Sequence, residues 1–207
     1  MDAETTPIPQ DDTRDKLLAA AGRQFADRGF YGASIAQIAG EVGLTKQALL
    51  YHFKRKEDLY GEVLKGIAAR LLAALQMNRD PSKPAAAQFE DMILGLYANR
   101  RDNPLDTKIL MRELLDDQRR DAPESEWFLK MFLEEIVSVL DDVPGQAELP
   151  HTEKFARIYI LLSASEYFVA SEASLRRFYG DEKYREMQAA YPAELSGMVR
   201  RMLAGNS

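Results

Sequence analysis

The sequence predicts an all-α protein of about nine helices, and three observations support this fold class. Apolar residues recur at spacings of three and four through most of the chain, as they do on one face of an α-helix. No stretch of any length alternates apolar and polar residues as a half-buried β-strand does. Prolines and glycines divide the chain into segments of helix length. With 207 residues, of which 46% are hydrophobic, the chain can form a small N-terminal domain and a larger helical body.

The first helix is predicted over residues 13–28. Its apolar stripe consists of Leu17, Leu18, Ala21 and Phe25. Gly29 is expected to end this helix. The preceding residues, 1–12, carry four acidic side chains and no apolar run, so we expect a disordered acidic tail there and not a signal peptide.

Two very short helices joined by a glycine turn are predicted next. Ser34 and Gln37 have the spacing of a capping box, which satisfies unpaired amide donors at a helix start. Gly43 permits a sharp turn, and the Thr45 hydroxyl can cap the second short helix, at about residues 46–52. Two helices joined in this way form a helix-turn-helix, whose second helix docks in the DNA major groove.

The outward face of the second short helix is polar, and a basic cluster follows it. The face carries Thr45, Lys46, Gln47, Ala48 and Tyr51, and the cluster consists of His52, Lys54, Arg55 and Lys56. Between Gly32 and Lys56 the only acidic residue is Glu41, against four cationic residues. Contacts with phosphate require such local positive charge. We predict that these residues bind DNA together with Ser34 and Gln37, although a glycine-interrupted helix pair also occurs in ordinary helical bundles.

The charge of the chain is divided along its length. Residues 13–70 hold ten Lys/Arg and six Asp/Glu, a net charge of +4. Residues 1–12 carry −4 and residues 71–207 carry −6, which makes the total −6. Because charges in solution are screened beyond about 8 Å, the local field decides binding, and an acidic total does not exclude a DNA-binding protein.

Six longer helices are predicted after the two short ones. Their approximate ranges are 56–77, 85–102, 105–119, 124–142, 151–179 and 181–204. The first of these should link the N-terminal domain to the body. The helix over 151–179 interleaves large and small residues and is apolar on all sides, which implies burial on more than one side. Pro192 is expected to bend or split the last helix.

Several classes of function lack their motifs in this sequence. The chain has no cysteine, which removes disulfides and thiolate chemistry and fits a reducing cytoplasm. It has no Gly-rich phosphate loop, no HExxH zinc motif and no nucleophilic serine elbow. We interpret His151 as a surface residue and not as a metal ligand. No apolar run reaches the length of a membrane span. The sequence therefore predicts no enzyme, metal site, cofactor or membrane association.

Residues 13–60 resemble the DNA-binding domain of the TetR (tetracycline-repressor-like) transcriptional regulators. The resemblance rests on Phe25, Gly29-Phe30, Ser34-Ile35, Ile38-Ala39, Gly43-Leu44-Thr45-Lys46, Leu49, Tyr51-His52-Phe53 and Lys56-Glu57-Asp58-Leu59. Leu50 stands where the family often has a tyrosine that touches the DNA backbone. Arg55 stands where a serine or asparagine commonly caps the next helix. The rest of the chain matches the family only in length and helical character.

The resemblance implies a homodimer in which residues 61–207 bind an effector. The last two helices would pair with their two-fold mates, with Leu162, Ala164, Ser165, Phe168, Met198 and Met202 as expected interface residues. A central helix in a monomeric bundle is the alternative. The candidate ligand-binding residues are Tyr97, Met111, Arg112, Trp127, Met131 and Glu166. Aromatic and methionine stripes also form filled cores, so the cavity itself is a hypothesis. Glu166, the only charge in its apolar stretch, should pair across the interface or meet a ligand.

The sequence as a whole predicts a two-domain, homodimeric regulator of transcription that resembles TetR. We expect a cytoplasmic repressor that a small-molecule effector releases from a palindromic operator in double-stranded DNA. Its two DNA-binding domains would lie in successive major grooves, about 34–36 Å apart. The alternatives are an activator and a helical protein-interaction adaptor that retains the same DNA-binding domain.

Overall fold

The computed structural model describes residues 10–116 and 123–204, and this part of the chain is helical without any strand. Its helices are α1 (Gln10–Gly32), α2 (Ile35–Glu41), α3 (Lys46–His52), α4 (Lys56–Met77), α5 (Ala85–Asp102), α6 (Pro104–Leu114), α7 (Pro123–Val139), α8 (His151–Ala170) and α9 (Glu172–Ala204). A 3-10 helix, η2 (Leu140–Asp142), follows α7. The predicted all-α fold class is confirmed.

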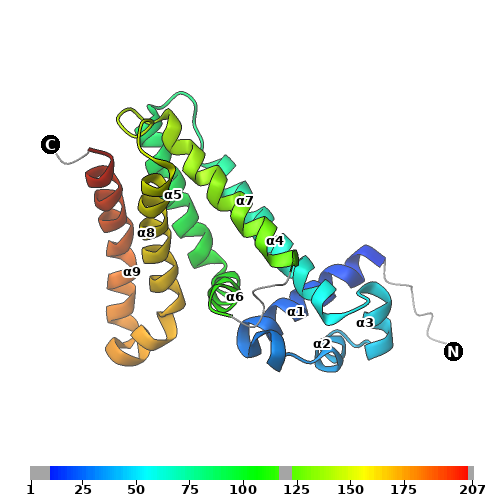
Figure 1. The fold of residues 1–207 in the computed structure, drawn as a ribbon. Coiled ribbons are helices and arrows are strands. Elements are labelled where there is room, and N and C mark those ends of the chain that lie inside the picture. Colours follow the sequence, from blue (N-terminus) through cyan, green and yellow to red (C-terminus); the bar gives the residue numbers. More distant parts are fainter. Residues whose placement is uncertain (1–9, 117–122, 205–207) are drawn as a thin grey trace.

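The first three helices and the start of α4 form a small domain, the head, at one end of the molecule (Figure 1). Its buried apolar residues include Leu17, Ala21, Phe25, Ile38, Ala39, Leu49, Leu59 and Tyr60. The ring of Phe25 lies edge-on to the ring of Tyr60, with the two centroids 4.8 Å apart, and this contact holds α1 against α4. The short helices α2 and α3 bury one side each in this core.

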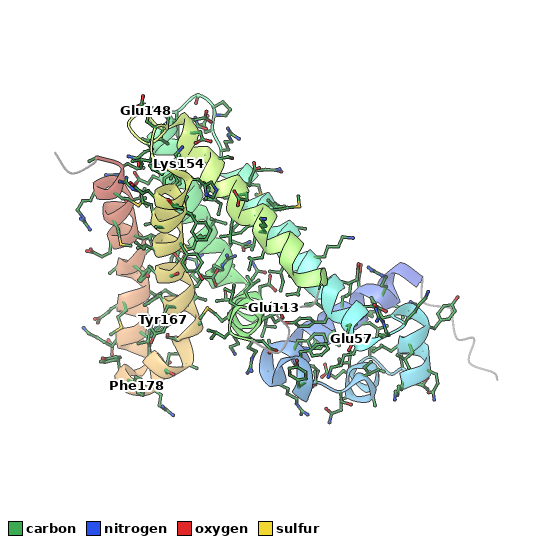
Figure 2. The ribbon with its side chains drawn as sticks, viewed as in Figure 1. Glu57, Glu113, Glu148, Lys154, Tyr167 and Phe178 are labelled. Carbon is green, nitrogen blue, oxygen red and sulfur yellow. The ribbon has the colours of Figure 1, made fainter. Side chains whose placement is uncertain are left out.

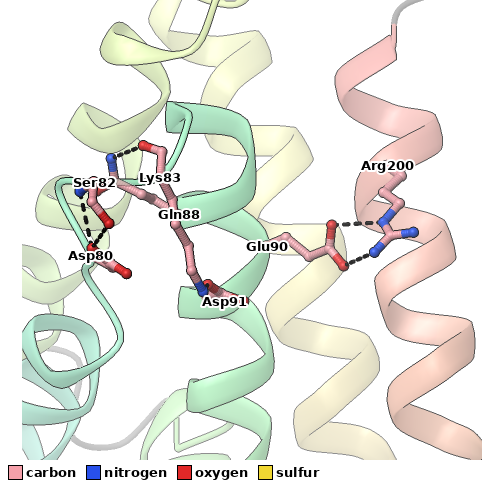
Figure 3. A network of polar contacts seen from close by, with 7 residues as sticks. All are labelled: Asp80, Ser82, Lys83, Gln88, Glu90, Asp91 and Arg200. Carbon is pink, nitrogen blue, oxygen red and sulfur yellow. Dashed lines mark hydrogen bonds and ion pairs between the residues drawn. The ribbon is translucent and has the colours of Figure 1, made fainter.

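The remaining helices form the body, and the long helix α4 connects it to the head (Figure 1). α7 runs beside α4, and α8 and α9 lie antiparallel to each other on the side of the body away from α4. Two ion pairs involve the first part of α5 (Figure 3). The guanidinium of Arg200 on α9 donates two hydrogen bonds of 2.8 Å to the carboxylate of Glu90 on α5. Lys83, in the α4–α5 loop, lies 2.6 Å from Asp91.

The ends of α1 and α6 differ from the predictions. α1 begins at Gln10, inside the predicted tail, of which residues 1–9 lie outside the described residues. The predicted end at Gly29 is confirmed in its backbone, which is non-helical there with φ of 69°, and one more helical turn follows to Gly32. α6 ends at Leu114 and not at residue 119. Acidic side chains follow one another at that end of α6. Their negative charges are repelled by the negative pole of the helix dipole, which disfavours a longer helix.

The last two helices are interrupted at the predicted Gly180 and also at Ser171, which was not predicted. The predicted helix over 151–179 ends at Ala170, where the Ser171 hydroxyl donates to the carbonyl of Tyr167 at 2.6 Å. Such side-chain bonds compete with helical ones. Gly180, with φ of 81°, then kinks α9. Pro192 does not split α9, which continues through it to Ala204. The φ that proline imposes is itself helical, so the helix continues through it and loses one hydrogen bond.

No helix in residues 10–116 and 123–204 is both long enough and apolar enough to cross a lipid bilayer.

Candidate nucleic-acid interface

α2 and α3 form a helix-turn-helix in the head. Gly43, with φ of 72°, adopts the left-handed conformation that reverses the chain between the two helices. The N–H of Leu44 donates to the carbonyl of Ala39 at 2.9 Å and closes the end of α2. At the start of α3, the Thr45 hydroxyl accepts a hydrogen bond of 3.2 Å from the N–H of Ala48. The predicted cap of α3 is therefore present.

The predicted capping box of α2 does not form. Ser34 occupies the N-cap position, but its side chain makes no capping hydrogen bond. The amide oxygen of Gln37 instead accepts a hydrogen bond of 2.8 Å from Nη1 of Arg28. Hydrogen bonds from a charged guanidinium are about twice as strong as neutral ones, which explains why Gln37 turns away from the start of its helix. Gln37 is exposed and Ser34 is half-buried.

The side of α3 that points away from the head core is polar. Of its residues, Thr45, Lys46, Gln47 and Tyr51 are exposed, and Ala48 and His52 are half-buried. Tyr51 is 78% exposed, and its ring lies edge-on to the ring of His52 with the centroids 5.7 Å apart. Leu49 on the opposite side is fully buried and attaches α3 to the head. This arrangement leaves a polar helix face of the kind that a DNA major groove accommodates.

The three cationic residues that follow α3 have different surroundings in the structure. Lys54 is exposed. Arg55 donates from its backbone N–H to Oδ2 of Asp58 at 3.1 Å, and from Nη2 to Oδ1 of Asp58 at 2.8 Å. Asp58 thereby satisfies the start of α4, where the usual small polar capping residue is missing. The hydrogen bonds from Arg55 also lower the pKa of the Asp58 carboxyl.

Lys56 turns back toward the head. Its Nζ lies 4.8 Å from the centroid of the Phe30 ring and donates to the carbonyl of Tyr31 at 3.4 Å. Burial of this amine lowers the pKa of Lys56. The expected phosphate contact of Lys56 therefore competes with contacts inside the head. The sequence analysis did not predict that Phe30 and Tyr31 contact the Lys56 amine. The feature that could have indicated it is the pair of adjacent aromatic residues after Gly29.

The candidate ligand-binding residues do not lie together. Tyr97 and Glu166 face the body core, where Glu166 forms an ion pair with Arg100 of the same chain, and not across an interface. Met111 and Arg112 line a cleft of about 420 Å³ between head and body. Met131 is exposed, and the side chain of Trp127 lies outside the described residues. Met111, Arg112 and Met131 thus lie apart from Tyr97 and Glu166, because α6 and α7 carry large apolar side chains on more than one face. Spacing alone could not identify the inward face.

The expected interface residues of α8 and α9 are engaged largely within the chain. Leu162 and Ser165 are buried, and the Ser165 hydroxyl donates to the carbonyl of Leu161 at 3.2 Å. The carbonyl of Ala164 accepts a hydrogen bond of 2.7 Å from the Tyr191 hydroxyl. Phe168, Met198 and Met202 are partly buried against the same core.

A different side of α8 is exposed. It carries Tyr159, Ile160, Ser163 and Tyr167. Ile160 is 60% exposed and Tyr167 is 71% exposed. Tyr167 lies toward the α8–α9 turn, as does the exposed Phe178 (Figure 2). Because α8 is apolar all round, the sequence marked it as buried on several sides but did not identify which side remains outside.

In the described residues, no group of three or more His, Cys, Asp or Glu is placed to hold a metal ion.

Comparisons with known proteins agree on the N-terminal part of the chain. Residues 17–63 match the family model described as bacterial regulatory proteins, tetR family. The HTH-type transcriptional regulator RutR of Escherichia coli K12 is 38% identical over 99 residues, which cover 48% of this chain and 46% of RutR. The HTH-type transcriptional repressor KstR2 of Mycolicibacterium smegmatis is 36% identical over 95 residues, which cover 46% of each chain. The matches thus span about half the length of these curated relatives.

The fold of the whole chain also occurs in a solved structure. A TetR-like transcriptional regulator from Rhodococcus sp. RHA1 superimposes with a TM-score of 0.73 and covers 97% of this chain and 100% of its own. The sequence identity over this match is 20%, so the similarity concerns the fold alone.

Proposed function

We propose that this chain, whose residues 17–63 belong to the TetR family of bacterial regulatory proteins, is a homodimeric regulator of transcription that binds a palindromic DNA operator. We further infer that it acts in the bacterial cytoplasm as a repressor, which a small-molecule effector releases from that operator. Support for repression comes from KstR2, a relative that is named a repressor.

The exposed polar face of α3 carries the proposal. Lys46, Gln47 and Tyr51 project from a helix whose opposite side is buried through Leu49. Lys and Tyr side chains are suited to phosphate, and Gln can form two hydrogen bonds with the edge of an adenine. Lys54 adds an exposed cation just after α3. One such helix reads only a few base pairs, so two copies on a palindrome are needed for a specific site.

The exposed apolar side of α8 supports a second copy of this chain as the partner. Tyr159, Ile160 and Tyr167 lie at helical spacings on that side, and contiguous apolar surface of this kind marks interaction sites. An interface through α8 whose two-fold axis runs along that helix would place the two heads on the same side of the dimer, as binding to successive major grooves requires.

Contacts of α6 support a route by which the body would control the head. Arg112 donates to the carbonyls of Ala26 and Asp27 in α1, both at 3.1 Å. The next residue, Glu113, accepts a hydrogen bond of 2.8 Å from the Tyr60 hydroxyl on α4. Glu113 lies between body and head (Figure 2). A displacement of α6 would therefore move α1 and α4 together and change the separation of the two heads.

The effector has to discriminate between two conformations of the dimer. A hundredfold loss of operator affinity requires about 2.7 kcal/mol of preference for the conformation that does not bind DNA. By linkage, the operator must weaken effector binding by the same factor.

Fluorescence anisotropy with a labelled duplex from upstream of the protein's own gene tests the DNA-binding proposal. We expect two chains per duplex and an affinity that falls steeply with salt, because bound cations are released from phosphates. A duplex of equal length and unrelated sequence should bind far more weakly. Equal affinity for both duplexes would favour the adaptor alternative.

A further inference from the structure

A cleft, which we call the junction cleft, lies between the head and the body. It has a volume of about 420 Å³, and residues of α1, α4 and the C-terminal end of α6 line it. Such a volume is in the range that small-molecule sites occupy. Glu113, near that end of α6, marks this region between body and head in Figure 2. Because the walls of the junction cleft belong to both domains, a bound molecule would contact head and body at once.

Aromatic rings form the head side of the junction cleft. Phe30, Tyr31 and Tyr60 line it. The Phe30 ring lies edge-on to the rings of Tyr31 and Tyr60, with the centroids 5.2 Å apart in both pairs. The Tyr60 hydroxyl already donates to Glu113, so Tyr60 offers its ring. Tyr31 is 57% exposed, and an exposed ring beside a cleft can pack against another planar ring.

Two guanidinium groups make the junction cleft positively charged. Arg28 and Arg112 line it with one acidic residue, Asp116, and two positive charges minus one negative charge leave +1. Nε and Nη2 of Arg112 donate to carbonyls of α1, and its Nη1 lies 3.4 Å from the point that a Cβ on Gly29 would occupy. Arg28 donates to Gln37 from Nη1 alone, and a guanidinium has five N–H groups. Guanidinium groups hold planar carboxylates through paired hydrogen bonds, and one carboxylate would neutralise this lining.

We propose that the junction cleft binds a small aromatic carboxylate, whose ring packs against Tyr31 and whose carboxylate accepts hydrogen bonds from Arg28 and Arg112. The binding site is independent of the proposed function, but its consequence rests on that function, because the ligand then serves as the effector. A carboxylate held by Arg28 competes with Gln37, a candidate DNA contact on α2, for the same guanidinium. The ligand would thus act on the connection between head and body and on the candidate DNA interface.

Two arginines of α1 provide a matched pair of variants. Both are exposed, and each donates to a side chain of α2: Arg28 to Gln37 at 2.8 Å and Arg23 to Glu41 at 3.2 Å. Of the two, only Arg28 lines the junction cleft. Arg28→Met should therefore weaken binding of an aromatic carboxylate roughly tenfold, the loss of one charged hydrogen bond. Arg23→Met should bind it as the parent does.

Two tyrosines provide a second matched pair, which tests the ring contact. Tyr31 is 57% exposed and Tyr179 is 58% exposed, and each ring lies edge-on to the ring of the phenylalanine before it. Tyr179 belongs to α9 and is not part of the junction cleft. Tyr31→Ala should weaken binding of the aromatic carboxylate roughly threefold, because a ring–ring contact is lost. Tyr179→Ala should leave that binding unchanged.

2-Naphthoate is the probe, and two related molecules separate the effect of its charge from that of its aromatic rings. 2-Naphthamide keeps the rings without the charge, and decalin-2-carboxylate keeps the charge and the two-ring skeleton without aromaticity. Titration calorimetry of the full-length protein should show that 2-naphthamide binds roughly tenfold more weakly than 2-naphthoate. Decalin-2-carboxylate should bind roughly threefold more weakly. Hydrogen exchange of α1 amides should slow with 2-naphthoate, because the ligand joins α1 to α6.

The inference is wrong if the parent does not bind 2-naphthoate, if 2-naphthamide binds equally well, or if Arg28→Met and Arg23→Met bind the probe alike. Equal binding by the two arginine variants would place the site elsewhere. Equal binding by Tyr31→Ala and Tyr179→Ala would likewise contradict the ring contact.

Anisotropy on the upstream duplex separates this inference from the proposed function. 2-Naphthoate should lower the affinity of the parent for the duplex, and that of Arg28→Met much less. A parent that binds the duplex without the probe but does not bind the probe refutes the junction cleft alone. Probe binding without any change in duplex affinity refutes the effector role. A protein that shows the predicted probe binding but ignores the duplex refutes the regulator and leaves the binding site standing.

Discussion

Arg112 on α6 donates from Nε to the backbone carbonyl of Ala26 on α1 at 3.1 Å, although the two residues are far apart in the sequence. The kink of α1 at Gly29 makes this contact possible, because it ends the regular hydrogen bonding of the helix close to Ala26 and exposes carbonyls there. Glycine is needed at position 29 for its backbone, whose φ of 69° a side chain would strain, whereas a Cβ there would make only an ordinary contact of 3.4 Å with Nη1 of Arg112. This contact links the body directly to the head.

Arg112→Met should loosen the head without disturbing the body. It keeps the apolar stem but removes two charged hydrogen bonds, and we expect a loss of about 1 kcal/mol because the side chain is largely exposed. Urea unfolding measures this loss, and hydrogen exchange should show faster exchange of α1 amides. Lys108→Met, an exposed substitution on the same helix, is the control. Identical exchange of α1 in both variants would show that the contact does not restrain the head.

Lys54→Ala should weaken binding to all DNA sequences alike. An exposed cation after α3 is suited to phosphate, so its removal should lower the slope of log affinity against log salt by about one unit. Lys108→Ala, in the body, should leave the slope unchanged. A parental slope for Lys54→Ala would place the phosphate contact on Lys56 or Arg55 instead.

Gln47→Ala should change which bases are preferred. A glutamine on the exposed face of α3 can pair with an adenine edge, and a good pair of this kind discriminates by about 1–3 kcal/mol. Selection from a randomised operator library should show relaxed preference at one position in each half-site, with a salt slope like that of the parent. A full parental preference would mean that α3 docks with a different face.

Thr45→Ala and Ser34→Ala should differ in stability. Thr45 accepts a capping hydrogen bond from Ala48, and its loss should cost about 1 kcal/mol. Ser34 makes no side-chain cap, so Ser34→Ala should cost much less. Urea unfolding of both variants tests the difference. Equal losses would show that the capping box of α2 forms in solution after all.

Ile160→Arg should separate the dimer. A charge at the centre of an apolar interface costs several kcal/mol, enough to dissociate most dimers of moderate affinity. Sedimentation should then show monomers with unchanged helix content and strongly reduced operator affinity. Met77→Arg is the control, because Met77 is 86% exposed at the far end of α4. A dimer that survives Ile160→Arg would place the interface elsewhere.

Local patterns in the sequence were sufficient for most of the fold and for the shape of the head. α3, α4 and α5 begin and end at the predicted residues, because Thr45, Pro84 and the surrounding apolar spacings act within a turn or two of the chain. The glycine turn at Gly43 and the cap at Thr45 are local in the same sense. The polar face of α3 followed directly from the positions of Leu49 and its neighbours on one short helix.

Tertiary structure decided everything that depended on which of several faces turns inward. Gln37 does not form the predicted cap because its side chain accepts a hydrogen bond from the charged guanidinium of Arg28 on another helix. Glu166, which the sequence left between two roles, pairs with Arg100, 66 positions away. Arg112 serves the contact between head and body because the kinked α1 lies beside α6. The sequence shows that an apolar residue on an amphipathic helix will be buried or that a charged one will be paired. Which residue it contacts depends on packing between helices that are distant in the sequence.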